Sequence, residues 1–315
     1  MRPVVIAHRG ASGYLPEHTL PAKALAYAMG ADYLEQDVVA TRDDALVVLH
    51  DIHLDRVTNV ESRFPGRHRS DGRYYVRDFD LGELRSLEVH ERVNEHGLPV
   101  YPGRYSGHGE IFRIQTLAEE LEFIRNLQDA HGRAVGVYPE IKRPAWHRHE
   151  GVDIAPEFLR VLADYGYTRH SDPIYVQCFD AGELRRIRHE LDCPLKLVQL
   201  IGEDSWGESS TRYGPLRTRR GLERLARTVD GIGPWLLRTV RRRRSDGRII
   251  ATGLVQRAHE AGLAVHPYTF RADELPEGFD SFDALLAFFF ENLAVDGLFT
   301  DFPDQVCQFL RRISR

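Results

Sequence analysis

Two short strings near the start of the chain, VVIAHRG at Val4–Gly10 and YLEQDVV at Tyr33–Val39, decide how the fold is interpreted. Each is an apolar, β-branched run that becomes polar where a strand is expected to end. Glu35 and Asp37 are two positions apart in the second run. Successive strand side chains point to opposite faces, so both carboxylates are expected on the same face. Together with the His-Arg pair that ends the first run, they predict a site for a metal ion and a phosphate group.

Apolar runs alternate with helical patterns along most of the chain. The expected strands are Val4–Ala7, Tyr33–Val39, Val135–Ile141, Ile174–Phe179, Leu195–Leu200, Asp230–Gly233, Ala264–Tyr268 and Gly297–Phe299. The expected helices are Leu20–Met29, Leu117–Asp129, Ile154–Tyr165, Gly182–Leu191, Gly221–Thr228, Thr252–Ala261 and Phe282–Asn292. This alternation predicts an α/β fold with a parallel sheet, closed into a (β/α)8 TIM barrel. An open, doubly wound sheet is the alternative, but no G-x-G-x-x-G motif follows the first strand.

The stretch from Asp51 to about Gln115 interrupts the alternation. It is rich in Gly, Arg, Pro, Tyr and Asp, which suit turns and short elements. A loop of that length without structure of its own is rare in a compact domain. We therefore predict one barrel domain over residues 1–315, with residues of about 51–115 inserted as a small cap domain over the pocket. Val47–His50 is expected to be a short strand that leads into this insertion.

Composition and charge exclude several classes of protein. The 315 residues carry a formal net charge of −5 at pH 7, which gives no bias toward nucleic acid. No apolar run reaches the ~18 residues that a membrane span needs. The three cysteines, Cys178, Cys193 and Cys307, are spaced like neither a zinc site nor a disulfide framework. An enzyme that acts on a small molecule is the expectation that remains.

Polar side chains end several of the expected strands, where the active sites of such barrels lie. Glu140 and Lys142 repeat the alternation of Glu35 and Asp37. Three carboxylates without cysteine suit one hard divalent cation, Ca²⁺ or Mg²⁺, and Glu35, Asp37 and Glu140 are the predicted ligands. A salt-bridge network with Arg9 and Lys142 is the alternative. It is less favoured because crowded carboxylates repel one another without a counter-charge.

Cations and imidazoles complete the predicted site. Arg9 and Lys142 are expected to bind an anionic substrate, since Arg can hold a phosphate through two N–H groups and Lys acts as a point charge. His8 and His50 are the expected general acid and base, because imidazole titrates near neutral pH. The role of His266, which also ends an expected strand, stays open. Loop or helix-surface positions are expected for His53, His131, His147, His149, His189 and His259.

The string HRGASGYLPEHTLPAKALAYAMGADYLEQDVVATRDDALVVLHD, from His8 to Asp51, resembles the N-terminal signature of the glycerophosphodiester phosphodiesterases, most closely the bacterial periplasmic type. YPEIK, QCFDAGELRRI, HPYTFRAD and VDGLFTDFPD resemble other segments of that enzyme, so the resemblance extends from Val4 to Leu310. It implies a (β/α)8 barrel with a small inserted domain. It also implies metal-dependent hydrolysis of glycerophosphodiesters, such as glycerophosphocholine and glycerophosphoethanolamine, to sn-glycerol 3-phosphate and an alcohol.

The resemblance assigns roles to particular residues. It implies catalysis by His8 and His50, metal binding by Glu35, Asp37 and Glu140, phosphate binding by Arg9 and Lys142, and an apolar contact by Phe179. Tyr268 and Trp235 are expected to join Phe179 in an apolar wall against the glycerol carbons. The family is thought to attack the phosphate with the substrate's own glycerol 2-hydroxyl, through a cyclic phosphate. The residues themselves leave open the nucleophile and the order in which the two histidines act.

Two other functions fit parts of the pattern. A phospholipase-D-like enzyme that acts on lysophospholipids would share the fold, but it would need an apolar rim, whereas the insertion is polar. A non-catalytic glycerophosphodiester-binding protein would most simply lack a histidine or a carboxylate of the site, and all are present. The resemblance implies a periplasmic protein, whereas the absence of a signal peptide before Val4, if genuine, implies a cytoplasmic one.

Overall fold

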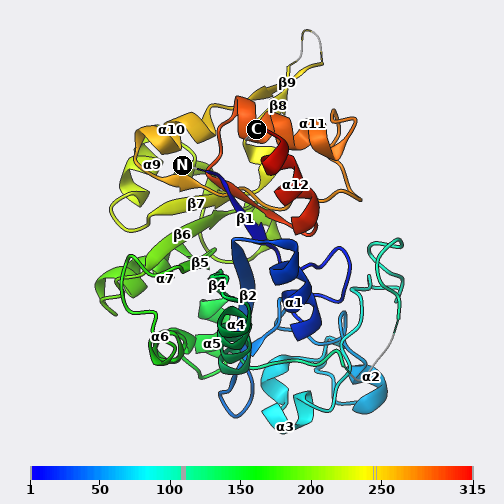
Figure 1. Cartoon of the computed structure of the whole chain (residues 1–315). Coiled ribbons are helices and arrows are strands. Elements are labelled where there is room, and N and C mark those ends of the chain that lie inside the picture. Colours follow the sequence, from blue (N-terminus) through cyan, green and yellow to red (C-terminus); the bar gives the residue numbers. More distant parts are fainter. Residues whose placement is uncertain (1, 108–110, 244, 246, 314–315) are drawn as a thin grey trace.

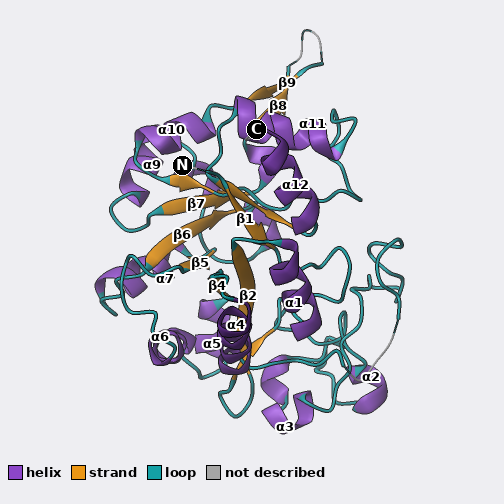
Figure 2. Cartoon of the chain, in the orientation of Figure 1, coloured by secondary structure: helices purple, strands orange, loops and turns teal. Residues whose placement is uncertain are grey.

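The computed structural model describes residues 2–107, 111–243, 245 and 247–313. Within these residues, eight parallel strands form a barrel and each is followed along the chain by a helix. Figure 2 shows the strands in orange with the purple helices outside them. The barrel strands are β1 (Val4–Ala7), β2 (Tyr33–Ala40), β4 (Gly136–Ile141), β5 (Tyr175–Cys178), β6 (Lys196–Ile201), β7 (Gly231–Pro234), β10 (Ala264–Val265) and β11 (Gly297–Thr300).

The outer layer consists of the helices that follow the strands. They are α1 (Leu20–Met29), α4 (Leu117–His131), α6 (Ile154–Asp164), α7 (Ala181–His189), α9 (Arg219–Leu225), α10 (Leu254–Glu260), α11 (Phe282–Ala287) and α12 (Pro303–Ile313). Shorter elements lie in the connections: β3 (Leu46–Val48), α2 (Val60–Arg63), η1 (Val76–Asp78), α3 (Leu81–Leu84), α5 (Pro144–His149), η2 (Asp204–Trp206), α8 (Tyr213–Leu216), η3 (Leu236–Arg238), β8 (Val240–Arg242), β9 (Ile249–Ala251) and η4 (Phe288–Asn292). Among the described residues, no helix has the length and apolar character needed to cross a membrane.

Backbone hydrogen bonds between β11 and the segment that follows β10 close the barrel. The strands pair in the order β10-β7-β6-β5-β4-β2-β1-β11. The Phe299 N–H donates to the Pro267 carbonyl at 3.0 Å, and the Phe270 N–H donates to the Phe299 carbonyl at 2.8 Å. These bonds join β11 to the segment that follows β10, so the backbone ring is completed. The predicted (β/α)8 TIM barrel is confirmed.

Apolar side chains fill the barrel beneath its carboxyl end. Strands buried on both faces are expected to be continuous apolar runs, and β4 (GVYPEI) is buried along its whole length. Ile6, Tyr138, Val198 and Phe299 form a cluster of their own from four different strands. The rings of Tyr138 and Phe299 meet edge to face with centroids 4.9 Å apart. The interior is therefore packed, and the polar residues at the carboxyl ends of the strands remain available for a site.

Local capping explains where two of the outer helices begin and end. The Thr19 hydroxyl accepts a hydrogen bond from the Ala22 N–H at the start of α1, and Gly30 ends the helix in the left-handed conformation. At the start of α4, Thr116 and Glu119 form a reciprocal capping box. These signals lie in the sequence itself, which is why both helices begin where the pattern predicts.

Three expectations differ from the structure. β10 contains only Ala264 and Val265, so it is shorter than the expected strand. Backbone hydrogen bonds toward β7 nevertheless continue from the His266 N–H to the Ile232 carbonyl and from the Tyr268 N–H to the Pro234 carbonyl, and Tyr268 forms a bridge with Trp235. The helix α12 was not expected, although its buried Val306, Cys307, Phe309 and Leu310 follow helical spacing. The surface position expected for His147 is wrong. Its side chain is buried in α5, and Nε2 accepts a hydrogen bond from the Ala40 N–H at 3.1 Å.

The stretch between β3 and α4 forms a separate lobe, drawn in cyan around α2 and α3 in Figure 1. Among its described residues, 51–107 and 111–115, there are short helices and turns but no strand. Its buried side chains, including Val57, Phe79 and Leu87, form one apolar cluster with Val39 of β2 and Val47 of β3. Packing against β2 and β3 thus anchors the stretch. Its role as a cap domain stays a prediction.

Gly10, next to the first expected site residues, gives a stability prediction. Its φ is +89°, and a Cβ there would lie 2.9 Å from the backbone C and O of Ala22 in α1. A left-handed backbone conformation costs a residue with a Cβ ~1–2 kcal/mol. Gly10→Ala is expected to lower the free energy of unfolding by more than this amount, because the new Cβ also clashes with α1. Gly66→Ala is the control, because Gly66 has φ +76° with no atom within 4 Å. Urea unfolding of both variants measures the difference, and an equal loss would contradict the predicted clash.

Candidate active site

Three carboxylates meet at the carboxyl end of the barrel. Glu35 and Asp37 lie on β2, and the register of β2 with β4 pairs Asp37 with Glu140. One oxygen of each side chain lies within 4.8 Å of the others, and all three residues are buried. The structure thus brings together the ligands predicted from the alternation along the two strands.

The three carboxylates have very different proton affinities. Burial and, to a smaller extent, the neighbouring Asp37 charge raise the pKa of Glu35 to about 8. Burial likewise raises the pKa of Glu140 well above its ordinary value. Burial acts in the same direction on Asp37, but the charges of Lys142 and His50 outweigh it and hold the Asp37 pKa well below its ordinary value. A cation among the three would favour the ionised form of every one.

The donor set fits a hard divalent cation. All three ligands offer carboxylate oxygen, which Mg²⁺ and Ca²⁺ prefer. Asp37 Oδ1 is buried and has no hydrogen-bond partner among the described residues. A buried acceptor without a partner is costly, and a cation in contact with this oxygen would satisfy it.

Two cations flank the cluster, as predicted. Arg9 follows β1, where its N–H donates to Glu35 at 2.8 Å and its Nη1 donates to both oxygens of Glu17 at 3.0 Å. Its buried Nε lies 3.5 Å from Asp37 but makes no hydrogen bond. Lys142 Nζ lies 2.9 Å from Glu140 and 4.0 Å from Asp37. The ion pairs of the alternative are therefore present, but the Arg9 Nε and the Asp37 Oδ1 take part in them without a hydrogen bond.

Each predicted catalytic histidine is held by an aspartate. His8 Nδ1 lies 2.6 Å from Asp301 Oδ1, and His50 Nδ1 lies 2.6 Å from Asp51 Oδ1. Both aspartates have a pKa well below the ordinary value, because neighbouring arginines and the histidines themselves outweigh the effect of burial. An ionised carboxylate only accepts hydrogen bonds, so each histidine carries its proton on Nδ1. The two Nε2 atoms are then free to accept a proton.

Burial also sets the charge of the two imidazoles. It lowers the pKa of His8 to about 4, with a further contribution from the charge of Arg9. Burial and the charges of Arg9 and Lys142 lower the pKa of His50 as well. Near pH 7 both side chains are therefore neutral, the form in which imidazole acts as a general base.

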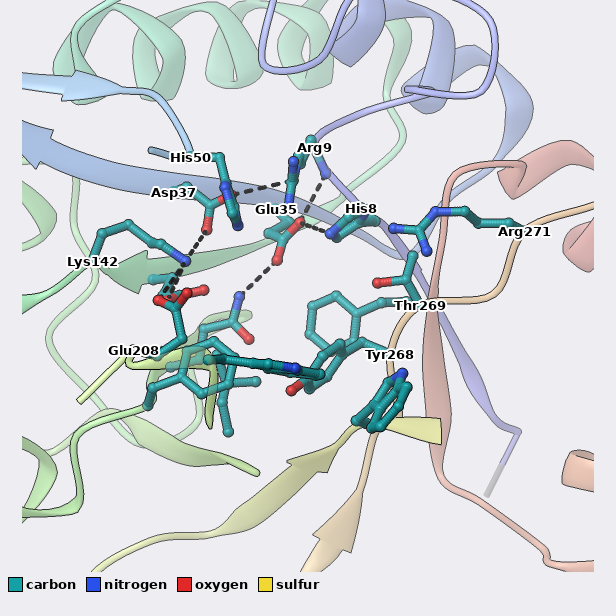
Figure 3. A pocket seen from close by; sticks show the side chains of 17 residues that line it. His8, Arg9, Glu35, Asp37, His50, Lys142, Glu208, Tyr268, Thr269 and Arg271 are labelled. Carbon is teal, nitrogen blue, oxygen red and sulfur yellow. Dashed lines mark hydrogen bonds and ion pairs between the residues drawn. The ribbon is translucent and has the colours of Figure 1, made fainter. Parts of the chain in front are cut away.

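An aromatic wall faces the polar cluster across one cavity of about 260 Å³. Phe179 and Tyr268 meet edge to face with ring centroids 6.0 Å apart, and Trp235 packs against Trp206 at 5.1 Å. Figure 3 shows Glu35, His50 and Arg9 across the cavity from Tyr268. The cavity is lined by every site residue that the sequence predicted: His8, Arg9, Glu35, Asp37, His50, Glu140, Lys142, Phe179, Trp235 and Tyr268.

Several side chains of the site were missed in the sequence. Gln177 lies one residue before the end of β5, where its amide donates to Glu35 at 2.9 Å, and Asp301 follows β11, so both carried the strand-end signal. His18, whose Nε2 lies 2.7 Å from Asp37, and Glu208, which lies 4.0 Å from Lys142, are on loops without such a signal. His266 lies deeper, where its Nδ1 meets the Tyr138 hydroxyl at 2.9 Å inside the barrel.

Comparison with known proteins agrees with the geometry. The chain matches the model of the glycerophosphoryl diester phosphodiesterase family over residues 8–305. It is 43% identical to a glycerophosphodiester phosphodiesterase of Haemophilus influenzae, over 98% of this chain and 90% of the relative. It is 37% identical to one of Treponema pallidum, over 99% of this chain and 93% of the relative.

Solved structures show the same barrel. An Oleispira antarctica phosphodiesterase in complex with the product sn-glycerol-3-phosphate has a TM-score of 0.65 at 20% identity, covering 98% of this chain and 97% of the other. A glycerophosphodiester phosphodiesterase of Agrobacterium tumefaciens has a TM-score of 0.60 at 20% identity, covering 97% of this chain and 99% of the other. These likenesses concern the fold. On the sequence matches, which span nearly its whole length, the chain belongs to the glycerophosphoryl diester phosphodiesterase family of enzymes.

Proposed function

We propose that this enzyme hydrolyses glycerophosphodiesters to sn-glycerol 3-phosphate and an alcohol, with one Ca²⁺ or Mg²⁺ bound by Glu35, Asp37 and Glu140. The observation that carries the proposal is the cavity in which these carboxylates, two cations and two histidines meet an aromatic wall. The diester end of such a substrate needs positive charge and proton transfer, and its glycerol carbons need an apolar surface. The cavity offers each of these to a small molecule.

The chain's own residues divide the work on the phosphate. A bound divalent cation supplies positive charge that stabilises negative charge developing on the phosphate oxygens. Arg9 Nε, which has no hydrogen-bond partner, and Lys142 Nζ face the same region and contact the other phosphate oxygens. Phe179, Trp235 and Tyr268 pack against the glycerol carbons and orient that end of the substrate.

His8 and His50 perform the proton transfers. One Nε2 takes the proton of the attacking oxygen, which belongs to water or to the glycerol 2-hydroxyl, and the other gives a proton to the leaving alkoxide. The histidine that acts as the acid must first gain a proton on Nε2. The negative charge of a bound phosphate favours this step, because it raises the pKa of a nearby imidazole.

A cation-exchange assay tests the proposal. The purified enzyme is stripped with chelator, supplied with Mg²⁺ or Ca²⁺ in turn, and given glycerophosphocholine, with sn-glycerol 3-phosphate release as the readout. Release is expected with at least one of the two cations, and none after chelation. Full activity in the presence of excess chelator would overturn the role of the cation, and no release under any condition would overturn the substrate class.

A second prediction concerns the alcohol. If the glycerol end is held and the alcohol is not, then glycerophosphocholine, glycerophosphoethanolamine and glycerophosphoglycerol should give kcat/KM values within about tenfold, a difference of ~1.4 kcal/mol. Bis(p-nitrophenyl) phosphate, which lacks glycerol, should be a poor substrate. Lysophosphatidylcholine is the decisive comparison, since Trp206 is partly exposed at the cavity and offers some apolar surface. Faster hydrolysis of that lipid than of glycerophosphocholine would favour the lysophospholipid alternative.

A further inference from the structure

The described part of the inserted stretch, residues 51–107 and 111–115, contacts the aspartates that hold the two histidines. None of the side chains in that part lines the central cavity. Two of its arginines, Arg92 and Arg104, instead border a second cavity of about 170 Å³ that His8 and His50 also line. Each of these arginines binds the aspartate that holds one of the two histidines.

A chain of hydrogen bonds, called the first arm, runs from Arg92 through Asp51 to His50. Asp51 holds the His50 Nδ1 with one oxygen, and its other oxygen accepts from Arg92 Nη1 at 2.6 Å. Arg92 is itself fixed by Glu17, which accepts from its Nη2 at 2.6 Å and from its Nε at 3.0 Å. Glu17 also binds Arg9, so the arm returns to a phosphate-facing cation. The Arg92 side chain is only 14% exposed.

The second arm is a chain of hydrogen bonds that runs from Arg104 through Asp301 to His8. Asp301 holds the His8 Nδ1 with one oxygen, and its other oxygen accepts from Arg104 Nη2 at 2.7 Å and from Arg271 Nε at 2.8 Å. Asp273 fixes Arg104 by accepting from its Nε at 2.8 Å. The Arg104 side chain is 5% exposed, and Figure 3 shows Arg271 beside His8.

The two arms have the same geometry although they come from different parts of the chain. In each, one carboxylate oxygen is taken by a buried guanidinium, which leaves the other oxygen directed at an imidazole Nδ1. Such a partner fixes the tautomer and the plane of the ring. Burying an arginine costs solvation free energy, and replacing a buried ion pair by well-packed apolar side chains is often neutral or stabilising. Stability alone therefore gives no reason for both buried arginines to end on histidines.

We propose that Arg92 and Arg104 are positioning residues, which act through Asp51 and Asp301 to hold His50 and His8 in the tautomer and orientation that proton transfer needs. The inserted stretch thereby sets the geometry of both histidines from outside the substrate cavity. The kinetic part of this inference rests on the proposed function, and a spectroscopic readout separates the two.

The kinetic test compares Arg92→Ala and Arg104→Ala with Arg73→Ala. Arg73 is the matched control, because it pairs with Asp55 at 2.8 Å within the same stretch and neither residue lines the central cavity. Each of the first two variants is expected to lose about 10–100-fold in kcat, with KM and calorimetric Ca²⁺ affinity little changed. Arg73→Ala is expected to keep its kcat. Arg92→Lys and Arg104→Lys should recover part of the loss, since lysine keeps one charged donor.

Double variants test whether each arginine acts through its own aspartate. Adding Arg92→Ala to Asp51→Asn should cost little more in kcat than Asp51→Asn alone, because the arm is already broken. Adding Arg92→Ala to Asp301→Asn should multiply the two losses, because the arms are separate. Multiplicative losses in both combinations would overturn the proposal, as would a kcat of Arg92→Ala and Arg104→Ala within twofold of the unmodified enzyme. If an alanine variant does not fold, the lysine variants carry the same comparison.

Nitrogen-15 NMR of the histidines gives a readout that does not depend on activity. With signals assigned from His8→Asn and His50→Asn, both histidines are expected in the Nδ1-protonated tautomer. The arginine variants should shift only the histidine of their own arm toward a mixture of tautomers. An unchanged tautomer in both variants would overturn the positioning role, even if the enzyme acts on another substrate. Expected shifts without glycerophosphodiester hydrolysis would contradict the proposed function and leave the positioning role standing.

Discussion

Glu35→Gln is expected to abolish both stabilisation by divalent cation and hydrolysis. The substitution keeps the size of the side chain but removes the charge from one of three carboxylates that lie within 4.8 Å of one another. A cation that binds only the folded protein stabilises it by ~2.7 kcal/mol at a concentration of 100 Kd, so the unmodified enzyme should show a higher Tm with Ca²⁺ or Mg²⁺. The variant should show neither this rise nor release of sn-glycerol 3-phosphate.

Glu208→Gln is the control for this result. Glu208 lines the same cavity but lies near Lys142, outside the cluster of three carboxylates. Its variant should keep the rise in Tm on addition of the cation. Scanning calorimetry of both variants with and without Ca²⁺ makes the comparison. Unchanged cation affinity in Glu35→Gln would remove Glu35 from the metal site.

His50→Ala is expected to fold and to bind the cation but to lose at least ~10²-fold in kcat. The His50 side chain is 25% exposed and bonds Asp51 through Nδ1, so its removal leaves no large cavity in an apolar core. What the variant lacks is the Nε2 to which the proposed function assigns a proton transfer, either from the attacking oxygen or to the leaving alkoxide. Steady-state kinetics with glycerophosphocholine measures the loss, and circular dichroism checks the fold.

His53→Ala serves as the matched control for His50→Ala. His53 is close in the chain but packs edge to face on Tyr75, with centroids 4.4 Å apart, and does not line the cavity. Its removal should leave kcat nearly unchanged. A nearly normal kcat of His50→Ala would contradict the role of His50 as general acid or base. An insoluble His50→Ala would indicate a structural role, and His50→Gln, which keeps a polar side chain of similar length, would then test the chemistry.

Local features of the sequence were enough to predict the barrel and the centre of its site. The two-residue spacing of Glu35 and Asp37 places both side chains on one face of β2 whatever the rest of the chain does, and Lys142 continues the same spacing from Glu140 one residue beyond β4. The barrel strands are buried runs, and their carboxyl ends meet at one edge of any parallel barrel. The alternation of side chains along a strand and the topology of the barrel are therefore enough to predict the cluster of carboxylates.

The tertiary structure alone decided how these groups are held. His8 bonds Asp301, 293 positions away, and Arg92 bonds Asp51 across 41 positions. The residue spacing of a helix or a strand does not relate positions that are so far apart in the sequence. His8 and Asp301 meet because β11 pairs with β1, and Arg92 and Arg104 reach the site because the apolar cluster of the inserted stretch packs against β2 and β3. The sequence by itself determined which side chains end the strands, since strand geometry is local. Which loop residues orient them depended on long-range packing, which only the folded chain specifies.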